Sequence, residues 1–190
     1  LLADLGPDQV NAQQAKAITC ALEHTLALIV GGPGTGKTHT LARLLALLIA
    51  DHPEKPPVIH LAAPTGKAAD RMKEAVEAAA DDLPATLPAT TKAALKTVAT
   101  SASTLHRLLG FNPSTGQCRA HATQKLRSDV VIVDECSMID TLLWQALLAA
   151  LEPTTRLVLV GDPHQLESVA AGDVLGSLVR FARAHPGTAL

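Results

Sequence analysis

The chain has 190 residues, of which 47% are hydrophobic and 18% are charged, and its formal net charge is -2. This length suits a single domain, and the apolar content is enough for a sizeable core. The near-neutral balance excludes a protein that binds nucleic acid through its overall charge, so any such contact must depend on a local surface. No apolar stretch approaches the ~20 residues needed to cross a bilayer, and no secretory leader is visible, so we expect a cytoplasmic protein without membrane attachment.

The three cysteines, Cys20, Cys118 and Cys136, are widely spaced and include no C-x-x-C pair. This spacing argues against a disulfide framework and against a zinc site, and it favours a reducing compartment. The chain begins with Leu, and its last helical pattern stops after Pro186. We therefore expect a fragment of a longer protein.

In the first half of the chain, short apolar runs alternate with longer helical patterns. They predict a strand at Leu26–Val30, a helix at Lys37–Ala50, a strand at Val58–Ala62 and a helix at Gly66–Ala80. The next segment, Asp81 to Thr100, is rich in Ala, Thr and Pro and is expected to be a flexible surface excursion.

The second half continues the alternation. A short helix is expected at Ser103–Leu109, followed by a β-hairpin or loop at Asn112–Ser128, because Asn-Pro-Ser-Thr-Gly is typical of a turn. The remaining predicted elements are the strand Val130–Val133, the helix Ile139–Leu151, the strand Arg156–Val160 and a helix from about Asp173 to Ala184. The pattern predicts an α/β domain over 1–190, mainly a parallel sheet with helices on both faces, with insertions at 81–101 and 111–128.

A phosphate-binding motif lies between the first predicted strand and its helix. Residues Gly31 to Thr38 satisfy G-x-x-x-x-G-K-[ST] in the context that the motif requires. The glycines allow backbone N–H groups to surround phosphates at the positive end of the helix, and Lys37 adds a full charge. The hydroxyl of Thr38 is a ligand for Mg²⁺. The expected cofactors are ATP and Mg²⁺, and the alternative is a plain glycine turn.

Two further predicted strands end in polar residues. Asp134 and Glu135 follow Val130–Val133, where ligands of parallel sheets gather. Asp134 is expected to hold Mg²⁺ and Glu135 to activate the attacking water, although a solvated acidic turn is the alternative. Gln165, after the strand at Arg156–Val160, carries a neutral amide able to contact the γ-phosphate or its water.

Five stretches taken together resemble superfamily 1 helicases of the RecD kind. They are Gly-Gly-Pro-Gly-Thr-Gly-Lys-Thr from Gly31, Ala-Pro-Thr-Gly-Lys-Ala-Ala from Ala63, Ser-Thr-Leu-His-Arg-Leu-Leu-Gly from Ser103, Val-Asp-Glu-Cys-Ser-Met-Ile-Asp from Val133 and Gly-Asp-Pro-His-Gln-Leu from Gly161. The resemblance covers nearly the whole chain in order. It implies a RecA-like P-loop NTPase domain, the first motor domain of an ATP-dependent DNA helicase.

The resemblance also assigns nucleotide contacts. Gln14 is placed like the glutamine that reads adenine in such helicases, although its neighbour Gln13 is a possible substitute and a polar helix residue is the plain alternative. The other nucleotide contacts implied are Gly32, Pro33, Gly34, Thr35, Gly36, Lys37, Thr38 and Thr40.

For DNA, Pro64, Thr65 and Gly66 match the helicase motif that grips the backbone of single-stranded DNA. Thr104, His106 and Arg107 are weaker candidates, and a histidine on a short helix is equally well a structural residue. A basic run is formed by Arg119, His121, Lys125 and Arg127, and it fits a DNA contact, a partner contact or a solvated loop.

The family further implies 5′ to 3′ translocation on single-stranded DNA, with RecB- and RecC-like subunits in an exodeoxyribonuclease V that serves double-strand break repair. Such helicases close ATP between two RecA-like domains, and the second domain supplies an arginine, so this piece alone is expected to show little turnover. Two alternatives stay open, a P-loop kinase and a DNA-tethering module with a degenerate ATP site. A kinase would ignore DNA, and a tether would hydrolyse nothing.

Overall fold

A parallel β-sheet forms the centre of the computed structural model, which describes residues 11–84, 87–163, 165 and 173–185. Its five strands lie in the order β1-β7-β6-β2-β3, and all four pairings are parallel. The strands are β1 (Leu26–Val30), β7 (Arg156–Gly161), β6 (Val130–Val133), β2 (Ile59–Ala63) and β3 (Ser103–Thr104). Because all five run in the same direction, their carboxyl ends meet at one edge of the sheet.

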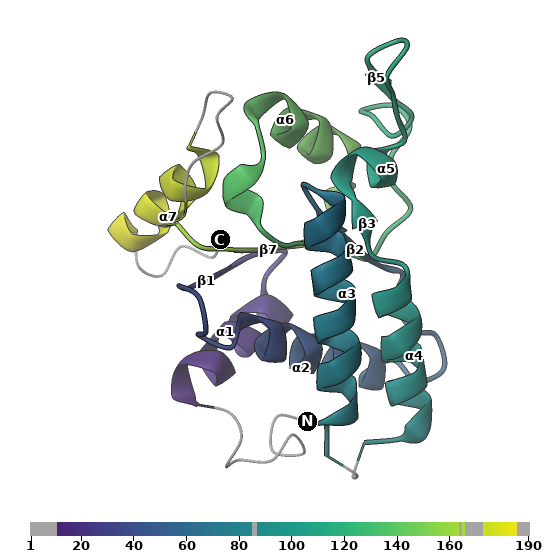
Figure 1. Ribbon diagram of the computed structural model, residues 1–190, viewed down its shortest axis with the longest axis vertical. Coiled ribbons are helices and arrows are strands. Elements are labelled where there is room, and N and C mark those ends of the chain that lie inside the picture. Colours follow the sequence, from purple (N-terminus) through teal and green to yellow (C-terminus); the bar gives the residue numbers. More distant parts are fainter. Residues whose placement is uncertain (1–10, 85–86, 164, 166–172, 186–190) are drawn as a thin grey trace.

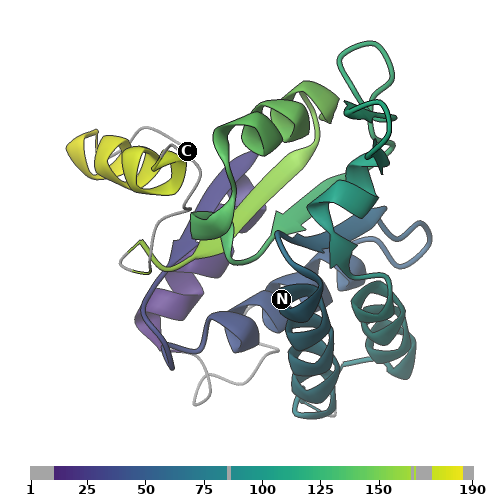
Figure 2. The ribbon, with the colours of Figure 1, turned by 45° about the horizontal axis from the view of Figure 1, so that its top comes forward.

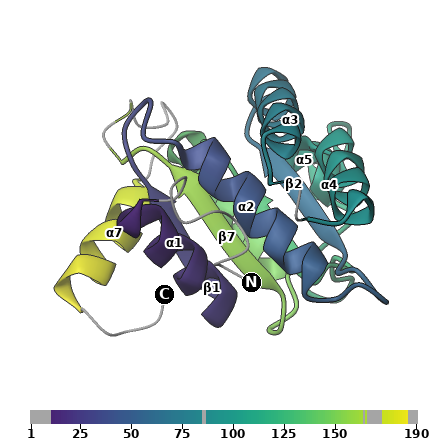
Figure 3. The same cartoon turned by 90° about the horizontal axis from the view of Figure 1, so that it is seen from below.

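Helices cover both faces of this sheet (Figures 1 and 2). One face carries α1 (Ala12–Glu23), α2 (Lys37–Ala50), α3 (Gly66–Asp81) and α4 (Ala89–Thr100), as Figure 3 shows. The other face carries α5 (Leu105–Leu109), the 3₁₀ helix η3 (Cys136–Met138), α6 (Thr141–Ala150) and α7 (Val174–Ala184). The expected α/β fold, a parallel sheet with helices on both faces, is confirmed.

The most buried elements explain this layering. All four residues of β6, Val130 to Val133, are buried, as expected for a central parallel strand whose two faces are both covered. In α2, residues Thr40 to Ile49 are all buried, because this helix lies on the sheet between α1 and the α3–α4 pair. The helix that follows the phosphate-binding motif is therefore fixed by packing from several sides.

A β-hairpin, β4 (Phe111–Asn112) and β5 (Gln117–Cys118), projects from the body beside α5 (Figure 1). Its turn ends at Gly116 with a φ of 68°, a left-handed conformation that glycine adopts without strain. The hairpin expected within Asn112–Ser128 is thus present.

Two features differ from the elements expected from sequence. The helix α1 precedes the first strand and was not among the predicted elements. The prediction of a flexible surface excursion at Asp81–Thr100 is wrong, because this segment contains the helix α4. Thr91, Leu95 and Ala99 of this helix are buried against α2 and α3. Residues four apart lie on one side of a helix, so this apolar stripe holds α4 onto the fold.

Boundaries elsewhere shift by one or two residues. The second strand begins at Ile59 and ends at Ala63, and Ser103–Thr104 forms a short strand before α5 rather than its first turn. Within the described residues, all three cysteines are free thiols and no cluster of metal-ligating side chains is present. No helix there is long and apolar enough to cross a membrane.

Candidate active site

Three loops converge at the carboxyl edge of the sheet. β1 and β7 pair up to Val30 and Gly161, and β6 lies on the other side of β7. The backbone N–H of Gly31 donates to the carbonyl of Gly161 at 3.2 Å, so the glycine loop begins against the end of β7. The loops that follow β1, β6 and β7 are the three that the sequence singled out.

The glycine loop, residues 31–36, turns the chain from β1 into α2. Gly34 and Gly36 have φ angles of 74° and 79°, in the left-handed region that favours glycine. Gly36 is the N-cap of α2 and has no side chain to satisfy the first N–H groups of the helix. These donors therefore face the loop, where the helix end also carries a partial positive charge.

Polar side chains of the loop point inward. The ammonium group of Lys37 donates to the carbonyls of Gly31 at 2.6 Å and of Gly32 at 2.8 Å, and it is partly buried. The hydroxyl of Thr35 donates to Gly32 at 2.9 Å. Lys37 thus lies inside the curve of the loop, at the place where an anion would gain most from its charge. Thr38 is half-buried in the first turn of α2, whereas Pro33 and Gly34 are exposed.

A pocket of about 180 Å³ adjoins the loop. α1 and the loop are in contact there, because a Cβ atom on Gly36 would lie 2.6 Å from the amide nitrogen of the Gln14 side chain. The pocket brings together four of the predicted nucleotide contacts, Gln14, Thr35, Lys37 and Thr40. It is also lined by Asn11, Gln13, Ala17, Ile29, Val30 and Gly31.

Gln13 and Gln14 both line this pocket, but their local roles differ. Gln14 forms a capping box with Asn11, in which the Asn11 side chain accepts from the Gln14 backbone at 2.8 Å and the Gln14 side chain accepts from the Asn11 backbone at 3.4 Å. This arrangement holds the Gln14 amide over Gly36. Gln13 is exposed and has no such anchor.

The acidic pair follows β6. Burial is the main cause that raises the pKa of Asp134, and the neighbouring Glu135 carboxylate raises it further. The hydrogen bond from the Glu135 backbone to Asp134, at 2.8 Å, and the charge of Lys37 act in the opposite direction. A carboxylate at the end of a central strand is the kind of oxygen ligand that Mg²⁺ prefers.

Glu135 has a left-handed backbone, with a φ of 52°, the only positive φ among the described non-glycine residues. This conformation costs about 1–2 kcal/mol for a residue with a Cβ atom. Glu135 is the N-cap of η3, which begins three residues after the end of β6.

Sequence reasoning missed two buried residues beside this pair. The thiol of Cys136 donates to the carbonyl of Val160 on β7 at 2.6 Å, and burial raises its pKa. Asp162, directly after β7, is only 5% exposed. Both residues lie within motifs that are visible in the sequence. Their burial could not be predicted, because a single buried side chain beside a loop produces no periodic pattern.

Gln165 is exposed, and its backbone N–H donates to the carbonyl of Asp162 at 3.2 Å. It does not line the nucleotide pocket. Its neighbours His164 and Leu166 lie outside the described residues, so its γ-phosphate role stays a prediction.

The candidate DNA residues lie at the same edge, on neighbouring strands. Ala63 of β2 pairs with Thr104 of β3. The hydroxyl of Thr65 accepts from the backbone of Ala68 at 3.2 Å as the N-cap of α3, and the hydroxyl of Thr104 accepts from Arg107 at 3.2 Å as the N-cap of α5. Both hydroxyl protons remain available to donate, and Thr65 and Gly66 are exposed.

His106 is exposed on α5, and its ring meets the edge of Phe111 with centroids 5.2 Å apart. This contact ties α5 to the hairpin. It gives His106 a packing role, and a DNA role stays a prediction.

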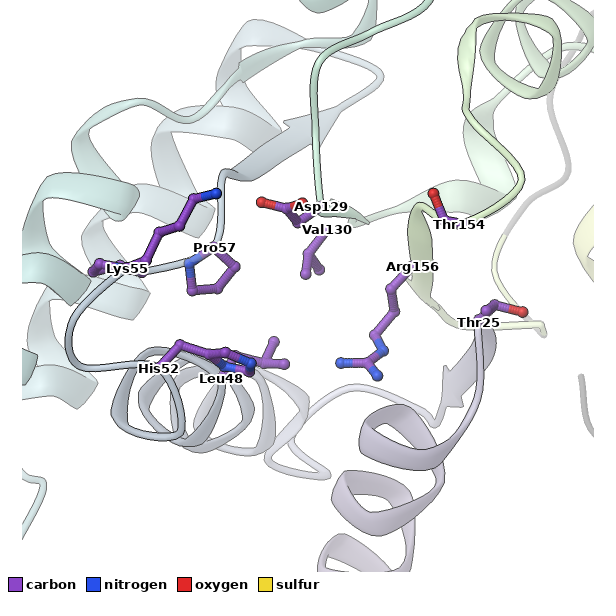
Figure 4. Close-up of a pocket in the computed structure, with 10 residues that line it drawn as sticks. Thr25, Leu48, His52, Lys55, Pro57, Asp129, Val130, Thr154 and Arg156 are labelled. Carbon is purple, nitrogen blue, oxygen red and sulfur yellow. The ribbon is translucent and has the colours of Figure 1, made fainter.

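A larger pocket, of about 320 Å³, lies at the opposite edge, where the strands begin (Figure 4). Its wall includes Arg156, whose guanidinium donates to the carbonyls of Leu22 at 2.8 Å and His24 at 3.2 Å. Asp129, also in the wall, accepts from the backbone of Val58 at 2.8 Å. These charges are used to join segments of the fold, and no residue of the glycine loop contributes. We therefore place the nucleotide at the smaller pocket.

Comparisons with known proteins identify relatives of this chain. The chain is 48% identical over 173 residues to the RecBCD enzyme subunit RecD of Mycolicibacterium smegmatis, with 88% of this chain and 30% of that protein covered. It is 35% identical to the ATP-dependent RecD2 DNA helicase of Deinococcus radiodurans, with 91% of this chain and 20% of that protein covered. The chain thus spans less than a third of the length of either relative.

Among solved structures, the Pif1 helicase of Candida albicans is similar with a TM-score of 0.52 and 21% identity, over 85% of this chain and 34% of that one. At this identity the likeness concerns the fold. The model of a family described as an AAA domain matches residues 14–171, from Gln14 through the loop after β7. The chain therefore belongs to this AAA domain family of nucleotide-binding proteins.

Proposed function

We propose that the chain is the ATP-binding motor domain of a DNA helicase of the RecD kind. One observation supports this proposal most. A single pocket at the carboxyl edge of the sheet is lined by Gln14, Thr35, Lys37 and Thr40. Asp134 and Glu135 follow β6, which pairs with β7, and lie at the same edge.

The side chains present fit a magnesium nucleotide. Among the described residues, the inward Lys37 ammonium donates hydrogen bonds to carbonyl oxygens alone, so it can exchange these bonds for phosphate oxygens. Thr38 and Asp134 would hold Mg²⁺, which neutralises developing charge on the phosphates. The capping box presents the Gln14 amide for the base.

Hydrolysis requires a base near the γ-phosphate, and Glu135 is the proposed one. Its carboxylate is not used by any hydrogen bond within the described residues, and its backbone is left-handed at the start of η3. A carboxylate in this position can accept a proton from the attacking water. Gln165, on the loop after β7, is proposed to contact the same phosphate.

For DNA, we propose that Pro64, Thr65 and Gly66, with Thr104 and His106 beside them, contact the backbone of single-stranded DNA. The N-termini of α3 and α5 lie next to each other, because the strands that precede them are paired. Adjacent helix N-termini suit successive phosphates. Nucleotide and DNA would then meet the same edge of one rigid sheet.

For the longer protein, we propose 5′ to 3′ translocation on single-stranded DNA, driven by ATP hydrolysis. We also propose association with RecB- and RecC-like subunits in a complex that repairs double-strand breaks, and a cytoplasmic location. These proposals rest on the similarity to RecD subunits, of which this chain covers less than a third.

Fluorescent ATP binding in the presence of Mg²⁺ tests the nucleotide site. We expect Lys37→Ala to abolish detectable binding, whereas Glu135→Gln keeps it, because Gln preserves the shape and removes only the base. Lys67→Ala, which changes an exposed lysine after the candidate DNA segment, is the matched control for lost charge. Equal binding by wild type and Lys37→Ala would refute the site.

Activity of the longer protein separates the alternatives. A helicase motor requires ATP hydrolysis that rises with single-stranded DNA and falls by about 10²-fold or more in Glu135→Gln. ATP turnover that ignores DNA but depends on a small acceptor would favour a P-loop kinase. DNA binding with no turnover in wild type would favour a tethering module.

A further inference from the structure

Charge is distributed unevenly along this chain. Its net charge is -2, yet no Asp or Glu occurs between Leu83 and Ser128. The same stretch contains six basic residues, namely Lys92, Lys96, Arg107, Arg119, Lys125 and Arg127. This stretch therefore carries a local excess of positive charge on a protein whose overall charge gives no sign of it.

The three lysines of this stretch have structural partners. Lys92 donates to the carbonyl of Leu83 at 2.7 Å, and Lys96 forms an ion pair with Asp81 at 2.7 Å. Lys125 donates to the carbonyls of Ala149 at 2.8 Å and Leu151 at 3.0 Å, at the end of α6. These three charges are thus largely used within the fold.

The three arginines are different. Arg107, Arg119 and Arg127 are all exposed, and no guanidinium among them has a hydrogen bond or ion pair within the part of the chain that the structure describes. We call these three residues the basic flank. Unpaired guanidinium groups that share a surface repel one another, and an anion between them removes that cost.

A pocket joins two members of the basic flank. It has a volume of about 320 Å³, and its walls carry Arg119, Lys125 and Arg127. The wall contains no acidic residue, and the remaining lining residues are Leu108, Ala120, Gln124 and Leu126. The floor is firm, because the Leu126 backbone donates to Ala150 at 2.8 Å and the Ala120 backbone donates to Leu109 at 3.0 Å.

The basic flank continues the candidate DNA edge. α5 begins beside Thr104 at that edge and spans only about 8 Å, from its five residues. At its far end, a Cβ atom on Gly110 would lie 3.2 Å from the Nε of Arg119. A nucleic-acid backbone that passes Thr104 and continues along α5 would therefore reach Arg119. An acidic peptide would not connect these two places, because nothing would bind it at the Thr104 edge.

We propose that the basic flank is a second nucleic-acid contact, which binds the phosphate backbone of DNA that extends beyond the single-strand track at the carboxyl edge. The proposal rests on the proposed DNA function of that edge. The phosphates can belong to more of the same single strand or to a duplex attached to it, since guanidinium groups bind both. No base is read, because the flank offers charge and no base-specific arrangement.

Fluorescence anisotropy with labelled DNA tests this contact across a range of salt concentrations. Three probes are compared, a short single strand, a longer single strand and the short strand with a duplex extension. We expect Arg119→Gln with Arg127→Gln to weaken binding of at least one extended probe roughly tenfold at low salt and to leave the short strand nearly unchanged. The slope of log affinity against log salt should shrink by about 1–2.

Three comparisons control this experiment. Arg183→Gln removes an exposed arginine from α7, on the other side of the molecule, and should leave all probes unchanged. Arg119→Lys with Arg127→Lys keeps the charge and should recover most of the salt slope even if the glutamine variant is poorly folded. Fluorescent ATP binding should be equal in every variant, which separates this site from the nucleotide pocket.

The extended probe that loses affinity identifies the source of the phosphates. If the glutamine variant binds all three probes as wild type does, with the same salt slope, the proposal is wrong. The flank would then be a candidate site for an acidic protein surface. If wild type binds ATP but none of the DNA probes, the DNA function of the edge fails together with the flank. A variant that loses affinity for the short single strand alone would also overturn the proposal, because the flank would then be part of the single-strand track at the carboxyl edge.

Discussion

At the scale of single residues, burial in the candidate site changes the pKa of some side chains. Asp134 is a perturbed group, since burial raises the pKa of its carboxyl above the ordinary 3.8. Its charged form is therefore less favourable in the folded chain than in the unfolded chain. A bound divalent cation would reverse this penalty, which is the expected property of a metal ligand that is also partly buried.

The pKa of Asp134 predicts a pH-dependent effect of Asp134→Asn. A raised folded pKa contributes stability below the unfolded value of 3.8, and that contribution is lost as the pH rises through the folded pKa. Asn has no proton to lose and keeps an oxygen that can accept from the Glu135 backbone. We expect the variant to have a higher Tm than wild type at pH 7–8 without Mg²⁺, with the difference shrinking toward pH 3.8.

Thermal melts of the two proteins at several pH values provide the measurement. The prediction fails if the variant is less stable than wild type by the same margin at every pH. Adding Mg²⁺ and nucleotide should then stabilise wild type more than the variant, because only wild type keeps the carboxylate ligand.

Gly36→Ala is predicted to damage the glycine loop through its backbone. The φ of 79° costs about 1–2 kcal/mol for a residue with a Cβ atom, and that atom would also meet the Gln14 side chain at 2.6 Å. Gly32→Ala is the matched control, because its φ is ordinary and nothing lies within 4 Å of the added atom. Chemical denaturation should show a loss of unfolding free energy for Gly36→Ala only, and equal losses would contradict the argument.

At the scale of elements, sequence predicts the parts whose apolar pattern is unambiguous. The helices α2, α3, α6 and α7 and four of the five strands of the sheet, β1, β2, β6 and β7, were expected within one or two residues, since their apolar runs and stripes are long. α4 was not expected, because Ala and Thr in its sequence suggest a linker and only Thr91, Leu95 and Ala99 form its buried stripe. Three small or apolar positions become a helix face only when α2 and α3 supply the surface to pack against.

Leu95→Ala tests whether α4 is part of the core. Leu95 is fully buried, so its truncation should cost about 2–5 kcal/mol of unfolding free energy. Thr97→Ala, at an exposed position of the same helix, should change stability by less than about 0.5 kcal/mol. Urea denaturation of both variants gives the comparison, and a negligible loss for Leu95→Ala would mean that α4 does not contribute to the core.

The sequence predicts those parts of the candidate site whose residues form contiguous motifs. The glycine loop and the Asp134–Glu135 pair each follow a strand, so parallel topology alone brings them to one edge. The choice between Gln13 and Gln14 depends on a capping box, and the structural use of Lys125 depends on the end of α6, which is distant in sequence. Contacts between separate elements have no signature in one sequence, so these details required the structure.

At the scale of the whole molecule, cations are scarce around the nucleotide pocket and frequent elsewhere. Lys37 is the only Lys or Arg that lines this pocket within the described residues, whereas the basic flank holds three unpaired arginines on another part of the surface. The transition state of phosphoryl transfer spreads charge over the γ-phosphate oxygens, and a single lysine stabilises only part of it. We therefore predict that a further cation is supplied from outside this pocket.

The scarcity of cations predicts that this chain binds ATP with little turnover. In other P-loop enzymes an arginine supplied from a second domain or partner accelerates hydrolysis by about 10³ to 10⁵. We expect single-turnover hydrolysis by the 190-residue chain to be slower than that of the longer protein by a factor in this range, at saturating ATP and with single-stranded DNA present. Glu135→Gln should slow the longer protein strongly and should change the residual rate of this chain much less. Equal rates for the chain and the longer protein would mean that Lys37 and Mg²⁺ are sufficient and that no further cation joins the site.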